Sequence, residues 1–265
     1  MRRAKARKAA NESLRAIILV IFLAVVFCFL YYERILLGAV VLQKVVTAQL
    51  FHDSAATQFQ TGTYFLNTRT ANYDTVRAQK YLTRAARIDP MYPYVHHELA
   101  RIYFLSGNFD AAELHATIEI QNNGDATPRA YYVRGLIRGF KGEYDGAIKD
   151  YAQYLEYDGN NWAAINDYAW VLLKADRFEE AIIASARGLQ MFPENAWLLS
   201  TNSVALAEFG YKGPAREQAH AAVLAAQHVT EEEWLTAYPG NDPRIAREGV
   251  QALQEAAELN AQMLK

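Results

Sequence analysis

Three consecutive side chains, His96, His97 and Glu98, are the clearest candidates for metal chemistry in this sequence. Zinc proteases place two histidines four positions apart on a helix, so that both imidazoles face one ion. The two histidines here are adjacent, and adjacent residues of a helix point about 100° apart. The spacing therefore predicts no zinc site, and the other histidines show no ligand spacing either. We expect no metal and no cofactor.

Other catalytic patterns are also missing from the sequence. It contains no phosphate-binding loop, no dinucleotide fingerprint and no serine nucleophile elbow. Adjacent acidic residues such as Glu179 and Glu180 are typical of a solvated helix face. The single cysteine, Cys28, allows neither a disulfide framework nor a thiolate cluster. We therefore expect a binding protein and not an enzyme.

The charge of the chain is concentrated at its N-terminus. Residues 1–15 contain six basic residues and one acidic residue, whereas the 265-residue chain as a whole has a net charge of −2. This basic segment directly precedes an apolar stretch, so it indicates membrane orientation, and we expect no nucleic-acid partner. The overall composition, 52% hydrophobic and 21% charged, is typical of a globular protein.

Residues 16–32 form an uncharged stretch of 17 residues. In a helix they would span about 25 Å, enough for the hydrocarbon core of a membrane, with Tyr31 and Tyr32 at the far interface. We predict a transmembrane helix at 16–34 behind the basic cytoplasmic segment, and a connecting helix at 35–58. The rest of the chain would face the other side, which is the periplasm for a bacterial inner membrane.

A cleavable signal peptide is the alternative to this anchor, because it has the same order of basic and apolar regions. No site with the small-x-small pattern follows Tyr32 closely, and the nearest candidate lies at 46–48. The sequence therefore favours an uncleaved signal-anchor.

Small and turn-forming residues recur along the chain with one period. They form three series, and each has intervals of 34 residues with a single interval of 35 at the same place. Such a period is the signature of stacked helix pairs, in which small residues let helix backbones approach closely. The series are Ala78, Ala112, Ala147, Ala181 and Ala215; Leu66, Ala100, Gly135, Ala169 and Ser203; and Pro90, Gly124, Gly159 and Pro193.

Between the small positions, a turn residue precedes an aromatic residue at 107–109, 142–144 and 176–178. At these residues the chain resembles the tetratricopeptide repeat (TPR) family, which implies an all-α, right-handed superhelical solenoid of four to five helix pairs. The match is good for three central units and weaker for the first and the last, where Lys212 replaces the aromatic and Pro214 follows. The implied units over 59–229 are 59–92, 93–127, 128–161, 162–195 and 196–229.

Residues 230–265 are expected to form a helical cap, which terminal repeats need. Thr230 and Glu233 have the spacing of a capping box. A turn cluster at 238–243 then precedes a final helix that we place at 243–264.

The resemblance also implies that the first helix of each unit lines a concave groove. This face is aromatic with a few cations, and it would suit a peptide or helix with apolar anchors. Each aromatic residue could instead pack between repeats. The positions implied are Tyr94, His97, Arg101, Phe104 and Leu105; Arg129, Tyr132, Leu136 and Phe140; Asn166, Trp170, Leu173 and Lys174; and Trp197, Ser200 and Val204.

The predicted function is therefore that of a membrane-anchored scaffold or adaptor, which binds a protein or peptide partner in its groove. Two alternatives remain open. The chain could be a fixed structural subunit of an envelope secretion or pilus-type assembly, with contacts through the helix after the anchor. It could also be an organelle outer-membrane receptor, since import receptors of that kind combine an anchor with such repeats.

Overall fold

The computed structural model describes residues 2–69, 72–237 and 242–264, without the side chains of 2–16, 28–30 and 33. The chain divides into two units, 1–52 and 53–265, and each is described by itself. The first unit consists of one helix, α1 (Arg2–Leu50). Its described side chains from Ile17 to Phe27 are apolar, and most of them are exposed by more than half.

The membrane span predicted at 16–34 is not supported by the structure. No helix in the described part of the chain has the combination of length and apolarity that crossing a bilayer requires. The connecting helix predicted at 35–58 also differs, because α1 ends at Leu50 and a new helix begins at Ala55. The hydroxyl of Ser54 caps this new helix by accepting the backbone N–H of Thr57 at 3.2 Å.

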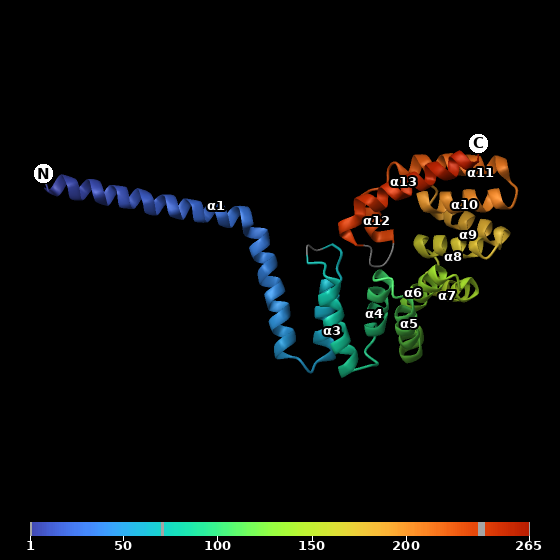
Figure 1. The fold of residues 1–265 in the computed structure, drawn as a ribbon, viewed down its shortest axis with the longest axis horizontal. Helices are drawn as coiled ribbons and strands as arrows, with labels where there is room; N and C mark the ends of the chain where they lie inside the picture. The colour runs from blue at the N-terminus through green and yellow to red at the C-terminus, as the bar shows by residue number, and fades with distance from the viewer. Residues whose placement is uncertain (1, 70–71, 238–241, 265) are drawn as a thin grey trace. The chain divides into compact units, whose positions relative to one another are not determined.

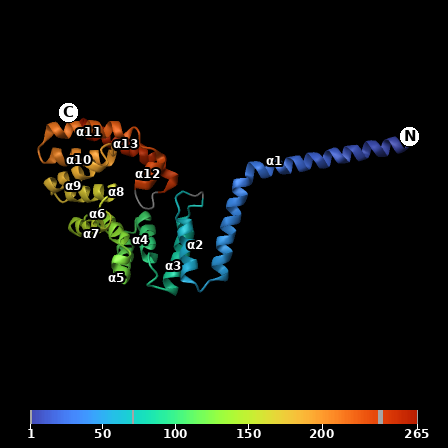
Figure 2. The same cartoon turned by 180° about the vertical axis from the view of Figure 1, so that it is seen from behind.

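In the second unit the described residues form helices and turns (Figures 1 and 2). Each helix packs against its pair partner, and successive pairs pack against each other. The pairs are α2 (Ala55–Phe65) with α3 (Thr75–Ile88), α4 (Val95–Leu105) with α5 (Phe109–Asn123), α6 (Arg129–Lys141) with α7 (Tyr144–Tyr157), α8 (Trp162–Lys174) with α9 (Phe178–Met191), and α10 (Ala196–Glu208) with α11 (Lys212–Ala226).

The small-residue series lie where the helices come closest together. All five alanines of the first series, from Ala78 to Ala215, are completely buried. In the second series, a Cβ atom added to Gly135 would lie 3.3 Å from the ring of Tyr151 on the paired helix. A larger side chain at these positions would push the helices apart, and this explains why the period appears as small residues.

The turns inside the four pairs from α4–α5 to α10–α11 share one repeated geometry. Gly107, Gly142, Asp176 and Gly210 all have positive φ values, of 74°, 80°, 57° and 99°. The following N–H reaches back five residues, as from Asn108 to the carbonyl of Tyr103 at 2.9 Å, which closes the helix as a Schellman motif does. Glycine adopts this left-handed backbone at no steric cost, which explains its recurrence here.

The chain ends in a helical cap, as expected. Thr230 and Glu233 form a reciprocal capping box at the start of α12 (Glu231–Ala237): the Thr230 N–H donates to Glu233 at 2.8 Å, and the Glu233 N–H donates to Thr230 at 3.2 Å. A short 3₁₀ turn, η2 (Pro243–Ile245), leads into α13 (Ala246–Met263). Helix α13 packs against α11 and α10, so it covers the last repeat.

Candidate functional site

Five aromatic rings from helices α4 to α8 form a continuous row, which we call the aromatic ridge. It consists of Phe104, Phe109, Phe140, Tyr144 and Trp170. The ring centroids of Phe104 and Phe140 lie 5.2 Å apart, and those of Phe109 and Phe140 lie 6.0 Å apart. Trp170 continues the row at 6.5 Å from Phe140 and 6.4 Å from Tyr144. The ridge thus crosses three successive helix pairs.

Phe140 is the most exposed member of the ridge. It is 59% exposed, whereas the other four rings are only partly exposed and pack against the core. It lies beside Gly139, where an added Cβ would lie 3.1 Å from a methyl of Val171, so α6 and α8 approach closely at this point. This close approach brings Phe140 and Trp170 into one surface. An exposed aromatic ring supported by other rings is a typical anchor point for a partner.

Lys174 extends the ridge at its far end. Its ammonium nitrogen lies 5.7 Å from the centroid of the Trp170 ring, within the range of a cation–π interaction. The side chain is exposed, at the C-terminal end of α8. The site therefore combines an aromatic surface with one positive charge.

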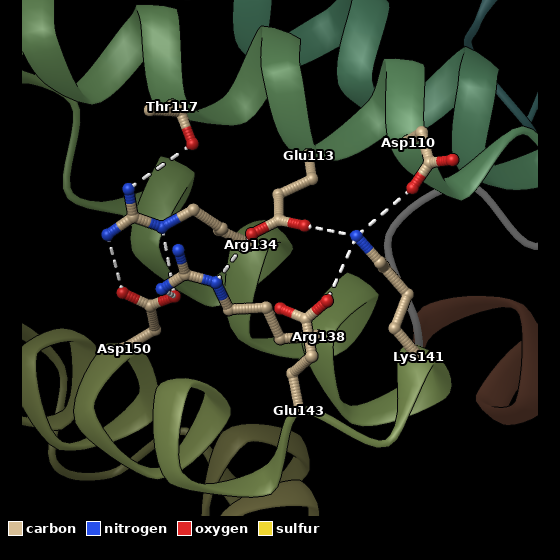
Figure 3. A network of polar contacts seen from close by, with 8 residues as sticks. All are labelled: Asp110, Glu113, Thr117, Arg134, Arg138, Lys141, Glu143 and Asp150. Atoms are coloured by element: carbon tan, nitrogen blue, oxygen red, sulfur yellow. Dashed lines mark hydrogen bonds and ion pairs between the residues drawn. The ribbon is translucent and has the colours of Figure 1, made fainter.

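A polar network holds the helices that carry the ridge (Figure 3). Arg134 donates two hydrogen bonds to the buried carboxylate of Asp150, at 2.9 and 2.7 Å. Arg138 bridges Glu113 and Asp150 at 2.8 Å each. Because these residues come from α5, α6 and α7, the network fixes α6 between its neighbours, and Phe140 projects from this fixed helix.

The outer end of the network surrounds Lys141 with carboxylates. Its ammonium group lies 2.6 Å from Glu113, 3.0 Å from Glu143 and 3.1 Å from Asp110. Hydrogen bonds to these groups raise the pKa of Lys141 above its usual value, and it stays charged. Burial raises the pKa of Glu113, but hydrogen bonds from Lys141 and Arg138 outweigh it and leave that pKa lowered. Both partners are thus ionised at neutral pH.

Three of the predicted groove residues are buried between helix pairs. Tyr132 donates its hydroxyl to Asp167 at 2.9 Å, and Asn166 accepts the hydroxyl of Thr201 at 2.8 Å. Leu136 belongs to the central core. The hydrogen-bond partners of Tyr132 and Asn166 lie one repeat further along the chain, so these two side chains link neighbouring repeats. All three residues are buried and do not form part of an exposed groove surface.

On α4 the predicted positions are mostly engaged as well. His97 is buried, and burial lowers its pKa to about 4. Arg101 pairs with Glu98 at 2.5 Å. Tyr94 meets the ring of His97 edge-on, with centroids 5.5 Å apart. Arg129, at the start of α6, is exposed.

The last repeat is covered by the chain itself. Trp197 stacks on Trp162, with centroids 5.0 Å apart, and packs in one cluster with Leu253 of α13. Asn260 of α13 donates to the hydroxyl of Ser200 at 3.0 Å. Two of the three groove positions predicted on α10, Trp197 and Ser200, therefore contact the C-terminal cap. Of the predicted set, Phe104, Phe140, Trp170 and Lys174 are the ones that come together in a partly exposed surface.

Sequence reasoning missed two parts of this site. Phe109 and Tyr144 were identified only as the aromatic residues that follow the turns and were not among the predicted groove positions, whereas they form part of the ridge. The polar network was not predicted at all, although the spacing of Arg134, Arg138 and Lys141 places them on one face of a helix. Within the described residues, no group of three potential metal ligands comes together.

Comparison with known proteins points to one repeat type. Residues 69–117 and 141–197 match the family model described as tetratricopeptide repeat. A search of curated proteins gives no match.

Solved structures with related folds have low sequence identity to this chain. YrrB, described as "a TPR protein with an unusual peptide-binding site", matches with a TM-score of 0.60 at 14% identity. The matched region covers 70% of this chain and 93% of the YrrB chain. A MamA structure from MSR-1 has a TM-score of 0.57 at 18% identity and covers 65% of this chain and 97% of its own. The Cut9–Hcn1 complex has a TM-score of 0.57 at 13% identity and covers 86% of this chain and 46% of its own. These likenesses establish the fold.

Proposed function

We propose that this chain, which carries tetratricopeptide repeats on an all-helical solenoid, is a scaffold. It binds a protein partner on the aromatic ridge. The observation that carries the proposal is the exposure of Phe140, 59%, at the centre of a row of aromatic rings that contact one another edge-on or tilted. Large aromatic side chains supply most of the binding energy at many interfaces because they bury much apolar area with little loss of side-chain entropy.

The surroundings of the ridge favour binding of a segment of a partner and not of a small molecule. The rings extend over three helix pairs and form a surface, so a ligand would need length to cover them. The polar network below them holds the helices in place before binding, which lowers the entropic cost of association. YrrB, with its peptide-binding site, carries a comparable repeat fold.

Cross-linking of the full-length protein in its native membranes, followed by affinity purification and mass spectrometry, tests this proposal. The variant Phe140→Ala/Trp170→Ala removes the most exposed ring of the ridge and the ring that continues the row on α8. The matched control is Leu114→Ala/Ile183→Ala, which removes two apolar side chains that are 60% and 63% exposed on α5 and α9. Partners lost with the first variant and kept with the second support the ridge. Partners kept by both variants, with helicity unchanged, exclude it.

We further propose that residues 16–34 of α1, in which the side chains of 16, 28–30 and 33 lie outside the described residues, anchor the chain in a membrane with its N-terminus in the cytoplasm. The support comes from the uncharged sequence at 16–32 and from the exposed apolar side chains between Ile17 and Phe27. Isolated in water, such a helix would expose a large apolar surface at high cost. The repeats would then lie on the extracytoplasmic side.

Alkaline extraction of membranes and a C-terminal reporter test the anchor. We expect wild-type protein to stay in the membrane pellet after carbonate treatment, and Val20→Arg/Leu23→Arg to move to the supernatant. A reporter fused after Lys265 should be active only outside the cytoplasm. Release of wild-type protein by carbonate, or reporter activity confined to the cytoplasm, would contradict the anchor or its orientation.

A fixed structural subunit is the second candidate function. Its support is the exposure, between 51% and 72%, of Ile35, Leu36, Leu42 and Leu50 on the second half of α1 and of Phe51 directly after it. An apolar helix surface of this kind suits permanent contacts with other subunits. Loss of the cross-linked partners with Leu42→Glu, but not with Phe140→Ala/Trp170→Ala, would favour this function over the scaffold.

A further inference from the structure

The ridge lies next to an acidic edge on its N-terminal side. Asp110 follows Phe109 directly in the sequence, and Glu143 precedes Tyr144. Their side chains are 91% and 47% exposed. Both carboxylates contact Lys141, as Figure 3 shows. Lys141 directly follows Phe140 in the sequence, so the acidic edge adjoins the ridge at the C-terminal end of α6.

This edge keeps an excess of negative charge after the ion pairs of the network are counted. Four carboxylates, those of Asp110, Glu113, Glu143 and Asp150, meet three cations, Arg134, Arg138 and Lys141. Asp150 is buried and Glu113 is half-buried, and both pair with Arg138. The excess charge therefore falls on the exposed pair, Asp110 and Glu143.

The opposite end of the ridge has the opposite charge. Lys174 lies over the Trp170 ring, and among the described residues no carboxylate is within ion-pair distance of its ammonium group. The other cations near the ridge, Arg101 and Lys141, already have carboxylate partners. The surface thus has a negative end, an aromatic middle and a positive end.

We infer that the ridge binds a peptide segment of fixed polarity, in which large apolar residues lie between a basic end and an acidic end. The basic residues would lie at Asp110 and Glu143, the apolar residues on Phe140 and Trp170, and a carboxylate at Lys174. Charges placed in this way contribute orientation and specificity more than affinity, and a segment bound in reverse would meet like charges at both ends. This inference rests on the proposed function of the ridge.

Selection from a display library of random twelve-residue peptides on the full-length protein in detergent tests this inference. We expect the enriched peptides to combine aromatic or leucine residues with a lysine or arginine near one end and a glutamate or aspartate near the other. Against the best synthetic peptide, Lys174→Glu and Asp110→Lys/Glu143→Lys should each weaken binding about tenfold. The controls Lys149→Glu and Glu156→Lys change exposed charges on α7 and should leave binding unchanged.

The outcomes separate the inference from the proposed function. Binding that is lost with Phe140→Ala but is insensitive to both charge reversals keeps the ridge as the site and overturns the polarity. Binding that persists with Phe140→Ala, or a library without enrichment, overturns the ridge as the site and the inference with it. A peptide with its two charged ends exchanged should bind wild-type protein at least tenfold more weakly, and equal binding would also contradict the fixed polarity.

Discussion

The carboxylate of Glu119 on α5 accepts the backbone N–H of Tyr94 at 2.7 Å, at the point where α4 begins. It also accepts the N–H groups of His96 at 3.0 Å and His97 at 3.2 Å. Tyr94 is the N-cap of α4, has φ of 67° and offers no capping side chain. The first N–H groups of a helix lack partners inside the helix, so Glu119 supplies the cap from the neighbouring helix.

Replacement of Glu119 should therefore destabilise the repeat unit although the residue is far from any exposed surface. The side chain is completely buried, and Glu119→Ala would leave three backbone donors without an acceptor. We expect a loss of about 3 kcal/mol in the free energy of unfolding, and a smaller loss for Glu119→Gln, which keeps one acceptor oxygen. Urea unfolding of the two variants measures both losses in the free energy of unfolding. Glu179→Ala, on an exposed helix face, is the control, and an equal effect there would contradict the capping role.

The buried histidine His97 should make the stability depend on pH. Burial lowers its pKa to about 4 in the folded state, whereas an unfolded histidine has a pKa near 6.5. Below pH 6.5 the unfolded chain binds a proton that the folded chain does not, so stability falls as pH decreases towards 4. The slope is about 1.4 kcal/mol per pH unit for one such proton. Burial and the neighbouring His96 also lower the pKa of His115 to about 4, so His115 makes the stability fall with decreasing pH in the same way.

His97→Leu should reduce this acid sensitivity. The Nδ1 atom of His97 is buried without a hydrogen-bond partner. Replacement by leucine therefore removes the titratable imidazole without breaking a hydrogen bond at Nδ1. We expect the difference in unfolding free energy between pH 7 and pH 5 to shrink relative to wild type, and the exposed His220→Leu to leave it unchanged. Chemical denaturation at the two pH values measures this difference. An unchanged difference in the His97 variant would show that other groups cause the acid sensitivity.

The turn at Asp176 offers a stabilising substitution. Its φ of 57° corresponds to the left-handed region that glycine occupies at 107, 142 and 210. A residue with a Cβ atom is strained there by about 1 kcal/mol, so Asp176→Gly should raise the stability by up to that amount. The reverse change, Gly142→Ala, should lower it by a similar amount. Thermal unfolding shows whether each variant is more or less stable than the wild type. A loss of stability in Asp176→Gly would mean that the aspartate side chain makes a compensating contribution.

The sequence alone predicted the parts of this fold that repeat. The buried alanine series and the left-handed turns follow from one local requirement that recurs in every unit, such as close packing at Ala147 or positive φ at Gly142. The residues that differ between units were harder to place. Asn166 was predicted to face the groove, but its partner Thr201 lies 35 residues away, and only the packing of two repeats shows that they meet.

The helix boundary after α1 and the polar network could not be predicted from the sequence, and the reason is the same for both. Ser54 can be identified as a capping residue only once a helix is known to begin at Ala55. Asp150 acquires its role because Arg134 and Arg138 reach it from another helix. Such contacts depend on how long side chains extend across an interface, which periodicity does not specify.

The buried carboxylate of Asp150 gives the last prediction. It is 3% exposed and compensates two guanidinium groups, those of Arg134 and Arg138. Asp150→Asn would leave these cations next to each other with Glu113 as the only carboxylate of the inner network. Removing one partner from a buried ion pair costs about 3–5 kcal/mol, and because the amide keeps its oxygen we expect about 3 kcal/mol here. The exposed Asp145→Asn should change stability by less than about 0.5 kcal/mol.

A second substitution distinguishes loss of charge balance from loss of packing at Asp150. Adding Arg138→Gln to Asp150→Asn removes one of the uncompensated cations, so the double variant should be more stable than the sum of the two single effects predicts. Urea unfolding of the four proteins of this cycle gives the coupling energy, which we expect to be at least about 1 kcal/mol. Strictly additive effects would mean that the two residues stabilise the fold independently. The network would then not fix α6, and the position of Phe140 in the ridge would depend on helix packing alone.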